Sequence, residues 1–408
     1  MPKPLGQGVV FATYNGLLDP LGPSQILPYL ERLHRDFPVH ILSFERSERL
    51  AQRTALEAMG RRTASAGIRW TWLRYHKKPS LPAKVFDLAA GIFALRRILG
   101  DDSVGLIHAR GYLPMALAVR ATRRIPILFD IRGLQAEEYV DGGLWKEGEL
   151  KWRLTKASEK TFFRRAAGAV VLTRNILPFV EQQFASQGRA PPVSVIPCCV
   201  DLERFTFDER ARSERRLELG VEDSAVLFVY SGSIGTWYMP EAMARFVRAF
   251  RQSTGRAVFL LWMVNNEQER VRAASRAAGL DAREFTALSA APHDVPAYLS
   301  AADVALAMIR PSFSKRASSP TKYAECLAMG LPLLICKDVG DGNELEALGG
   351  AVTVISDCGD DALADASSRL AALMTRGRPH FRRVATELFD VDCVGVPAYH
   401  ALYEKLMA

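Results

Sequence analysis

The segment that decides the fold is RPSFSKRASSPTKYAECLAMGLPLL, which spans residues 310–334. Residues 318–321 are Ser, Ser, Pro and Thr, which are typical of a helix cap and first turn. Gly330 is suited to end that helix, and Pro332 leads into an apolar run typical of a buried strand. The segment therefore predicts a helix over 321–329, preceded by a loop and followed by a strand.

Positive charge is concentrated where this helix begins. Arg310, Lys315, Arg316 and Lys322 together exceed what a helix cap needs. The free N–H groups of a helix N-terminus, helped by a lysine, bind phosphate groups well. Glu325 follows one turn later, where its carboxylate can accept hydrogen bonds from ribose hydroxyls. We therefore expect a diphosphate at the helix start; a capped helix without a ligand is the competing interpretation.

Strand-like and helix-like patterns alternate on both sides of this segment. This rhythm predicts doubly wound parallel α/β sheets, and it restarts after about residue 200. We expect two Rossmann-like domains facing a cleft, residues 1–199 and 200–390, with a helix in 391–408 that crosses back to the first. Strands are expected at 8–13, 39–44, 105–109, 125–130, 169–173, 225–230, 257–264, 304–308, 333–335 and 352–355. Helices are expected at 23–36, 81–99, 113–122, 147–166, 239–254, 267–278, 295–301, 321–329 and 362–375.

Two loops of the first half follow expected strands, which is where ligands of open α/β sheets bind. Residues 14–25 contain Gly22, and glycine lets a backbone approach a phosphate closely. Asp130 and Arg132 end a buried strand, so we expect these charged side chains to face the cleft. A plain long loop and a structural Asp–Arg pair are the competing interpretations of these two segments.

A third loop, YSGSIGTW at 230–237, joins a strand to a helix in the second half. Small residues before a helix start form an anion-binding loop, with Gly232, Ser233 and Gly235 as the candidates. A tight turn would also explain it. The chain has neither a G-x-G-x-x-G segment after its first strand nor a G-K-[ST] phosphate loop here, which disfavours dinucleotide and Walker-type sites.

The composition excludes several classes of protein. Of 408 residues, 49% are hydrophobic and 24% charged, which disfavours a disordered chain. No apolar run approaches the roughly 20 residues that span a bilayer, and no signal peptide is evident, so we expect a cytoplasmic protein. The six cysteines form no C-x-x-C pair, so no metal site is expected.

The charge is unevenly placed. Residues 1–199 contain 29 Lys/Arg and 17 Asp/Glu, a net +12, whereas residues 200–408 contain 24 and 28, a net −4. Such asymmetry indicates an anionic partner for the first half, either nucleic acid, an anionic membrane surface or a phosphorylated acceptor. No nucleic-acid-binding motif is recognisable, so we expect no nucleic acid. A solvated basic surface is the competing interpretation.

The segment 74–99 adds a local reason to consider a membrane. Basic residues precede and interrupt an apolar helical pattern, which favours peripheral binding to the inner face of the cell membrane. Packing of this helix on the sheet is the competing interpretation. The basic residues are Arg74, Lys77, Lys78, Lys84, Arg96 and Arg97, and the apolar ones are Val85, Phe86, Leu88, Ala89, Ile92, Phe93, Leu95 and Leu99.

Seven segments together resemble GT-B glycosyltransferases of glycosyltransferase family 4, over nearly the whole chain. They are YNGLLDPLGPSQILPYL, LIHARGYLPMALA, FDIRGLQAEEYVDGGLW, AVVLT, VIPCCVDLERF, YSGSIGTWYMPE and SSPTKYAECLAMGLPLL. The resemblance implies a nucleoside-diphosphate sugar in the C-terminal domain and a glycan or lipid-linked acceptor on the N-terminal one. It also implies transfer with retention of configuration, in polysaccharide or glycolipid synthesis, without a cofactor or metal. The donor nucleotide could be UDP, GDP or another nucleoside diphosphate.

The resemblance carries site residues onto this chain and shows departures, among them a histidine position of the family that falls near Arg132 and glycines that are replaced by Asn265 and Asn266. Of the family's two glutamates eight positions apart, the second falls on Glu325 but the first falls on Ala317. The family's Arg and Lys after the first C-terminal strand are replaced by Ser233 and by the Trp-Tyr pair at 237–238. We expect a catalytic role for Asp130 and Arg132. The expected donor-binding residues are Gly22, Gly232, Ser233, Gly235, Arg310, Lys315, Arg316, Ser318, Ser319, Pro320, Thr321, Lys322 and Glu325.

Two alternatives remain open at this point. A sugar-nucleotide epimerase shares the two-domain fold, but it needs acids and bases around the sugar, and few candidates lie beside Lys322. A non-catalytic nucleotide-sugar-binding subunit would be consistent with Ala317 in place of a glutamate.

Overall fold

The computed structural model describes residues 7–76, 80–100 and 103–408. The chain divides into two compact units: unit 1 comprises Met1–Pro197 and Val391–Ala408, and unit 2 comprises Cys198–Asp390. Sequence analysis placed this boundary at 199/200.

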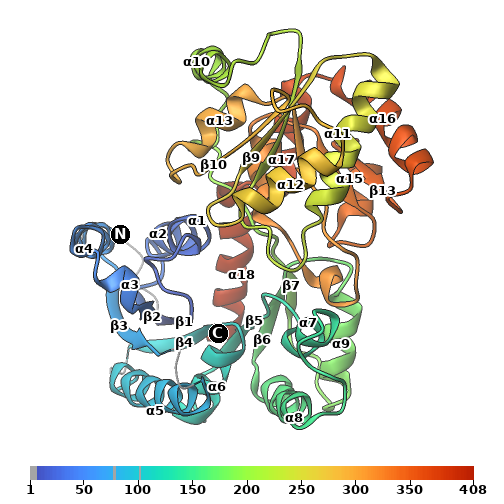
Figure 1. The fold of residues 1–408 in the computed structure, drawn as a ribbon. Helices are drawn as coiled ribbons and strands as arrows, with labels where there is room; N and C mark the ends of the chain where they lie inside the picture. The colour runs from blue at the N-terminus through green and yellow to red at the C-terminus, as the bar shows by residue number, and fades with distance from the viewer. Residues whose placement is uncertain (1–6, 77–79, 101–102) are drawn as a thin grey trace. The chain divides into compact units, whose positions relative to one another are not determined.

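Unit 1 contains a seven-stranded sheet in which every strand pairs in parallel with its neighbours, in the order β3-β2-β1-β4-β5-β6-β7 (Figure 1). Its strands are β1 (Gly8–Thr13), β2 (Val39–Arg46), β3 (Arg69–Tyr75), β4 (Val104–Arg110), β5 (Ile127–Asp130), β6 (Gly168–Val171) and β7 (Val193–Val195). The helices of the unit are α1 (Leu21–Gln25), α2 (Leu27–Leu33), α3 (Ser47–Leu50), α4 (Arg53–Ser65), α5 (Ser80–Ile98), α6 (Tyr112–Ala121), α7 (Gln135–Asp141), α8 (Leu150–Arg165), α9 (Leu177–Ala185), the π-helix η2 (Val391–Gly395) and α18 (Val396–Met407).

Unit 2 contains a six-stranded parallel sheet in the order β10-β9-β8-β11-β12-β13. Its strands are β8 (Val226–Ser231), β9 (Val258–Met263), β10 (Phe285–Leu288), β11 (Val304–Ala307), β12 (Leu333–Cys336) and β13 (Val352–Ile355). Its helices are α10 (Glu209–Leu219), α11 (Pro240–Thr254), α12 (Gln268–Ala277), α13 (Val295–Ala301), the 3-10 helix η1 (Ser314–Ala317), α14 (Thr321–Ala328), α15 (Gly342–Gly349), α16 (Asp360–Met374) and α17 (Arg378–Phe389).

The first strand of each unit determines where a ligand can bind. All six residues of β1 are buried, as are the first five of β8, because each strand lies inside its sheet with neighbours on both sides. In both sheets the second strand of the unit pairs with one side of the first strand and the fourth pairs with the other. The order in which strands are added to the sheet reverses at this point, so the loops after the first and fourth strands diverge and leave space between them. The fold class predicted from sequence, two α/β units with parallel sheets, is confirmed.

The structure corrects several predicted elements. The expected helix over 23–36 is two helices, because Ile26 departs from helical geometry at φ −122° and ψ −63°. Sequence analysis missed β3, β7 and β10. β3 is an edge strand whose residues (RWTWLRY) are all exposed or half-buried, so it lacks the apolar run that marks a central strand. β7 and β10 are only three and four residues long.

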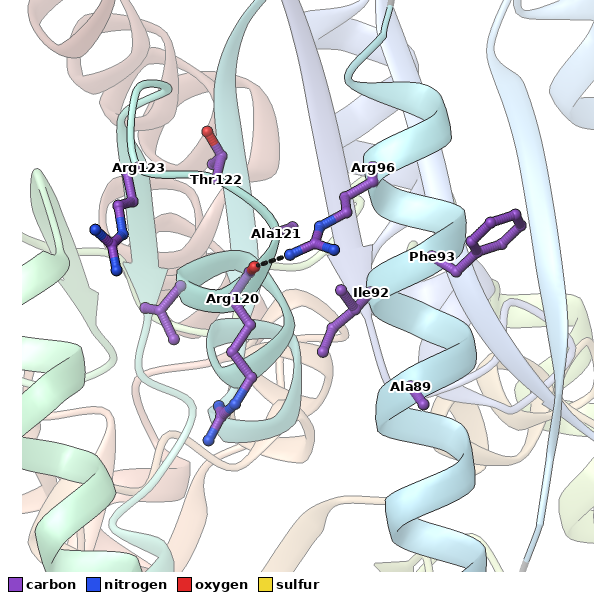
Figure 2. Close-up of a pocket in the computed structure, with 9 residues that line it drawn as sticks. Ala89, Ile92, Phe93, Arg96, Arg120, Ala121, Thr122 and Arg123 are labelled. Atoms are coloured by element: carbon purple, nitrogen blue, oxygen red, sulfur yellow. Dashed lines mark hydrogen bonds between the residues drawn. The ribbon is translucent and has the colours of Figure 1, made fainter.

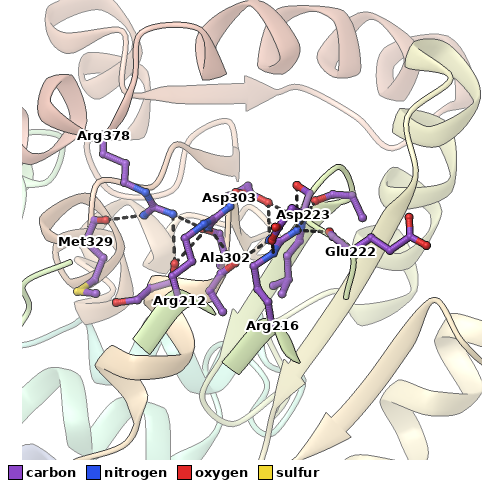
Figure 3. A network of polar contacts seen from close by, with 12 residues as sticks. Arg212, Arg216, Glu222, Asp223, Ala302, Asp303, Met329 and Arg378 are labelled. Atoms are coloured by element: carbon purple, nitrogen blue, oxygen red, sulfur yellow. Dashed lines mark hydrogen bonds and ion pairs between the residues drawn. The ribbon is translucent and has the colours of Figure 1, made fainter. Parts of the chain in front are cut away.

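A cluster of arginines fixes the ends of several elements in unit 2 (Figure 3). Arg216 is 1% exposed and donates to the carbonyls of Ala301 and Ala225 at 3.0 and 2.7 Å. Arg378 donates to the carbonyl of Met329, just past the end of α14, at 2.9 Å. Asp303 accepts from Arg216 at 3.2 Å and neutralises part of the cluster. These bonds satisfy carbonyls that helix ends leave unpaired, and they hold α14 in position.

No helix in the described part of the chain is both long and apolar enough to cross a membrane.

Candidate functional site

The site in unit 2 lies where the loops after β8 and β11 diverge. The loop after β8 runs through Gly232 to Tyr238, which forms an antiparallel bridge with Ile309 just past β11. The chain then passes through η1 into α14, whose first turn contains Lys322. The predicted helix over 321–329 is therefore α14, and the topology brings its start to the loop after β8.

Lys322 is the central residue of this site. Its side chain is buried, and its Nζ has no hydrogen-bond partner among the described residues. The ammonium lies 3.9 Å from the ring centroid of Tyr230 and 3.7 Å from that of Tyr238. Burial lowers the pKa of Lys322 to about 7, although the nearby Glu325 favours the charged form. Near neutral pH about half of the Lys322 side chains are therefore protonated, and a bound anion would favour the protonated form.

Because Gly232 has no side chain, it leaves space beside the ammonium of Lys322. Its φ is +119°, a conformation that side chains disfavour, and an added Cβ would lie 3.4 Å from the Nζ of Lys322. A larger residue would therefore be strained and would cover the lysine.

Two backbone N–H groups at the centre of the loop after β8, those of Ile234 and Gly235, are already engaged. The Oε2 of Glu267 accepts from the N–H groups of Ile234 and Gly235, at 2.8 and 3.2 Å. The carbonyl of Ser233 accepts from the hydroxyl of Tyr230 at 2.7 Å. These contacts leave the cation of Lys322 and the start of α14 as the groups best placed to bind a diphosphate.

The three other cationic residues predicted for the donor site lie over two different aromatic rings. Lys315 is buried and its Nζ lies 4.0 Å from the ring centroid of Trp237, over which Arg310 also lies at 5.4 Å. Arg316 is exposed and lies over Phe313 at 5.9 Å. Cation–aromatic contacts hold Lys315 and Arg310 beside the loop after β8, whereas Arg316 is held elsewhere on η1.

The predicted residues at the start of α14 are all half-buried: Ser318, Ser319, Pro320 and Thr321. The Oγ of Ser319 accepts from the N–H of Cys198 at 3.1 Å, which fixes this turn. Glu325, one turn later, is also half-buried; burial raises its pKa, and Arg204 and Lys322 oppose that rise. A carboxyl in such a place favours hydrogen-bonding partners such as hydroxyls.

In unit 1, Asp130 ends β5 and is 1% exposed. Its Oδ2 lies 3.3 Å from the Nε2 of His108 and accepts from the hydroxyl of Tyr399 at 3.3 Å, and its Oδ1 lies 3.6 Å from Arg132. Burial alone would raise the pKa of Asp130, but Arg132, His108 and Arg110 outweigh it and lower the pKa to about 2. Asp130 is therefore an anion that holds its neighbours in place.

Beside Asp130, a pocket of about 550 Å³ opens at the carboxyl ends of β1 and β4. Arg132 lines this pocket, whereas Asp130 lies behind it. The lining residues are Tyr14, Asn15, Tyr75, Lys84, Arg110, Gly111, Tyr112, Leu113, Pro114, Ala116, Arg132, Gln135, Tyr139, Leu154, Thr155, Ser158 and Phe162.

Gly22 has a clear structural reason to be glycine. A Cβ on Gly22 would lie 2.1 Å from the carbonyl oxygen of Leu17, so no side chain fits where the loop after β1 turns into α1. It is not among the residues that line the pocket.

The structure thus brings Gly232, Lys315, Arg310 and Lys322 to one edge of the unit 2 sheet. Sequence reasoning missed the residues that shape this edge, namely Tyr230, Trp237, Tyr238 and Glu267, and in unit 1 it missed His108, Arg110 and Tyr399. The dense aromatic content of YSGSIGTWY was a usable signal for the first three. Among the described residues, no group of three or more His, Cys, Asp or Glu is placed to hold a metal ion.

Comparisons with known proteins agree with the motifs. Residues 25–204 match the family described as Glycosyltransferase Family 4, and residues 226–372 match Glycosyl transferases group 1. A putative teichuronic acid biosynthesis glycosyltransferase, TuaC of Bacillus subtilis, is 26% identical over 248 residues. That match covers 59% of this chain and 54% of the relative, so it spans about half of the relative's length.

Solved structures share the fold of the whole chain. A glycosyltransferase from Rickettsia africae superposes with a TM-score of 0.72 at 12% identity, covering 98% of this chain and 99% of the other. HepE from Anabaena, in complex with UDP and glucose, superposes with a TM-score of 0.67 at 14% identity, covering 98% and 100%. At such identities the likeness concerns the fold.

We expect binding of a nucleoside diphosphate to take up a proton at Lys322. Near pH 7 and above, a growing fraction of Lys322 is neutral in the free protein, and the arriving anion favours the ammonium. Affinity should fall by up to about tenfold per pH unit above about pH 7. Calorimetry of UDP and GDP binding at about pH 8, in buffers of different ionisation enthalpy, measures the uptake.

Lys322→Met should abolish the proton uptake, and Lys337→Met, which removes an exposed lysine of the same unit, should retain it. Binding without proton uptake in the unaltered chain would contradict the assigned role of Lys322.

Proposed function

We propose that this chain, a relative of GT-B glycosyltransferases of family 4, transfers a sugar from a nucleoside-diphosphate sugar to an acceptor hydroxyl with retention of configuration. The two family matches support glycosyl transfer, and the relative TuaC, named for teichuronic acid biosynthesis, supports a place in cell-surface polysaccharide synthesis. The acceptor is a glycan or a lipid-linked glycan. The transferred sugar is a hexose or a close derivative.

The observation that carries this proposal is the buried ammonium of Lys322 at the edge of the unit 2 sheet. A lysine without a polar partner costs free energy when it is charged in such a place. A diphosphate would supply the missing negative charge. HepE, which shares the fold, carries UDP and glucose in its solved complex, and this also supports a uridine nucleotide as one candidate donor.

The residues near Lys322 suit the departure of a nucleoside diphosphate. As the bond between the sugar C1 and the phosphate oxygen breaks, negative charge develops on the phosphate, and Lys322 with the start of α14 stabilises it. The acceptor oxygen forms its bond to C1 on the same face, and its proton passes to the leaving phosphate. Glu325 then binds the ribose hydroxyls and is neither the acid nor the base. This route needs neither a metal nor a cofactor.

A non-catalytic nucleotide-sugar-binding subunit is the second candidate. One observation favours it: Ala317, where the family has a glutamate, is 3% exposed in η1 and offers no polar group to the donor sugar. Turnover of the donor, by transfer or by hydrolysis, separates an enzyme from a binder. An epimerase would instead convert the sugar nucleotide without an acceptor.

The acceptor binds in unit 1, in the pocket beside Asp130. Arg132 lines that pocket and contacts the acceptor, while Asp130 orients Arg132 through its charge. Asp130 is therefore a positioning residue rather than a group that touches the reacting atoms.

The basis of the proposal is tested by a thermal-shift screen against UDP, GDP, ADP and thymidine diphosphate. One of them should stabilise the full chain by about 2.7 kcal/mol at a hundredfold excess over its Kd, because a ligand that binds only the folded state adds its binding free energy. The corresponding nucleotide sugar should then be consumed, in an assay of donor hydrolysis. If none of the four gives a shift, the donor site is wrongly assigned.

A second test concerns Asp130. Asp130→Asn keeps the shape of the side chain but removes the charge that orients Arg132, so kcat/KM for the acceptor should fall at least tenfold. The Kd of the nucleoside diphosphate should not change. A rise in the acceptor KM indicates positioning, and a fall in kcat alone indicates direct participation. Unaltered kinetics would remove Asp130 from the mechanism.

We also propose that unit 1 binds an anionic membrane surface through α5, at the cytoplasmic face of the membrane. The helix packs inward through Leu95, which is fully buried, but it leaves Val85, Phe86 and Phe93 between 59% and 73% exposed. Beside Phe93 a groove of about 750 Å³ separates α5 from the end of α6, and Arg96, Arg120 and Arg123 line it (Figure 2). The basic residues Lys77 and Lys78 lie outside the described residues.

Flotation with vesicles tests this surface. The chain should float with vesicles of phosphatidylglycerol and phosphatidylcholine, but not with phosphatidylcholine alone, because arginines bind the anionic headgroups. Phe93→Ser should weaken flotation severalfold, since it removes an inserted ring. Leu217→Ser removes a still more exposed apolar side chain, in unit 2, which is 84% exposed, and should have no effect. Equal, negligible flotation at low salt would exclude membrane binding.

A further inference from the structure

The most exposed apolar side chains of the chain lie mainly in two segments of unit 1. Among the described residues, seven large hydrophobic side chains are 59% exposed or more, and six of them belong to α5 or to residues 144–154. The seventh is Leu217 of unit 2. The exposed apolar residues of the second segment are Leu144, Leu150 and Leu154, at 69%, 71% and 59%, and together they are called the α8 ridge below. Apolar side chains gathered in this way mark a surface that another molecule covers.

The backbone and the aromatic rings around the α8 ridge are fixed. The N–H groups of Leu144 and Trp145 both donate to the carbonyl of Tyr139, at 2.9 and 3.0 Å. The ring of Trp145 stacks on that of Tyr139, with 4.3 Å between the ring centroids. Leu150 and Leu154 are four residues apart, so they share one face of α8. The exposure of the ridge is therefore a property of a folded surface.

The unit 1 pocket opens between α5 and the α8 ridge. Helix α6 packs against both α5 and α8, and all three lie on the same side of the unit 1 sheet (Figure 1). Lys84 of α5 lines the pocket, and the next two residues, Val85 and Phe86, are exposed. On the other side, Leu154 belongs both to the lining and to the ridge. A surface that covers α5 and the ridge together therefore meets the mouth of the pocket.

The exposed charge around these apolar side chains is almost entirely positive. Among the residues described in α5, in 112–124 and in 144–165, Glu147 is the one exposed acidic residue. A second copy of this chain would bring like charges together, whereas the headgroups of an anionic membrane would attract them. The charge pattern therefore favours a membrane as the occupant. The exposed cations are Lys84, Arg96, Arg97, Arg120, Arg123, Arg124, Lys146, Lys151, Arg153, Lys160 and Arg164.

We propose that the α8 ridge inserts into the same anionic membrane as α5, so that the pocket opens at the membrane surface and takes the sugar of a lipid-linked glycan. This inference rests on the proposed function, because it concerns the acceptor of the same transferase. A water-soluble glycan would not need apolar side chains on both sides of the pocket. A lipid-linked glycan keeps its hydrocarbon chain in the bilayer, so that only its sugar enters the pocket.

Flotation with vesicles of phosphatidylglycerol and phosphatidylcholine tests the ridge. Leu150→Ser should weaken flotation severalfold, because it removes an inserted side chain. Leu150 is exposed and does not line the pocket, so the substitution should not affect the fold. Combined with Phe93→Ser, the two losses should multiply, since the side chains insert at separate positions. Leu217→Ser is the matched control and should float like the unaltered chain.

Two results of this experiment would overturn the proposal. One is flotation of Leu150→Ser that equals flotation of the unaltered chain. The other is a dimer of the unaltered chain in sedimentation that Leu150→Ser dissociates, because a second copy would then cover the ridge.

Acceptor glycosides show whether the pocket takes a lipid-linked sugar. The probes are glycosides of glucose, galactose, mannose and N-acetylglucosamine, each with an octadecyl chain in these vesicles or with a methyl group in solution. The donors are sugars of the nucleoside diphosphate that binds. The octadecyl form of the accepted sugar should react with a kcat/KM at least tenfold above that of its methyl form. Leu150→Ser should reduce this advantage, and Leu217→Ser should retain it.

A methyl glycoside that reacts as well as its octadecyl form would overturn the assignment of the acceptor. If a nucleoside diphosphate binds but no glycoside of either kind reacts, the proposed sugar transfer is contradicted instead. Flotation of Leu150→Ser distinguishes the two failures, because it depends on the ridge and not on turnover.

Discussion

Burial of the first strand in each sheet is the constraint on which the rest of this structure depends. β1 and β8 pair on both sides, so their residues are apolar and the chain must leave the sheet at their carboxyl ends. The neighbouring connections then run to opposite sides of the sheet, and polar groups can gather only in the space between them. In unit 2 that space receives Lys322 and the loop after β8. In unit 1 it forms the pocket with Arg110 and Tyr14.

Both sites contain positively charged side chains, namely Lys322 in unit 2 and Lys84, Arg110 and Arg132 in the lining of the unit 1 pocket. Lys322 has aromatic rings around its ammonium and no hydrogen-bonding acceptor among the described residues, and burial lowers its pKa. The unit 1 pocket has three cations in its lining, with Asp130 as an anion behind Arg132. Burial of the Lys322 ammonium without a hydrogen-bonding acceptor among the described residues costs free energy, and a bound anion would relieve that cost.

The sequence was sufficient for the fold and for the start of the helix α14. The alternating pattern predicted two parallel α/β units, and the cap residues before Lys322 predicted the start of α14. The residues that shape the site could not be predicted, because tertiary contacts bring them there. Tyr238 reaches Lys322 through a bridge to Ile309, which is distant in sequence, and Glu267 comes from the start of α12. Nor does the pattern around Asp130 indicate that it lies behind Arg132, since its burial depends on Tyr399 near the C-terminus.

In both units a glutamate carboxylate accepts hydrogen bonds from backbone N–H groups of the loop after the first strand. In unit 2, Glu267 accepts from the N–H groups of Ile234 and Gly235. In unit 1, Glu45, which is fully buried, accepts from those of Leu17 and Leu18 at 2.7 and 3.1 Å. A carboxylate that follows or ends the second strand of the unit thus occupies the N–H groups that bind phosphate in many Rossmann-like proteins. These N–H groups are therefore not available to an anion, and the positively charged groups beside each loop come from elsewhere in the unit. Those groups follow the fourth strand in each sheet, namely α14 with Lys322 after β11, and Arg110 with the start of α6 at the end of β4. The shared use of an internal carboxylate therefore explains why both candidate sites depend on side-chain cations rather than on a glycine-rich loop.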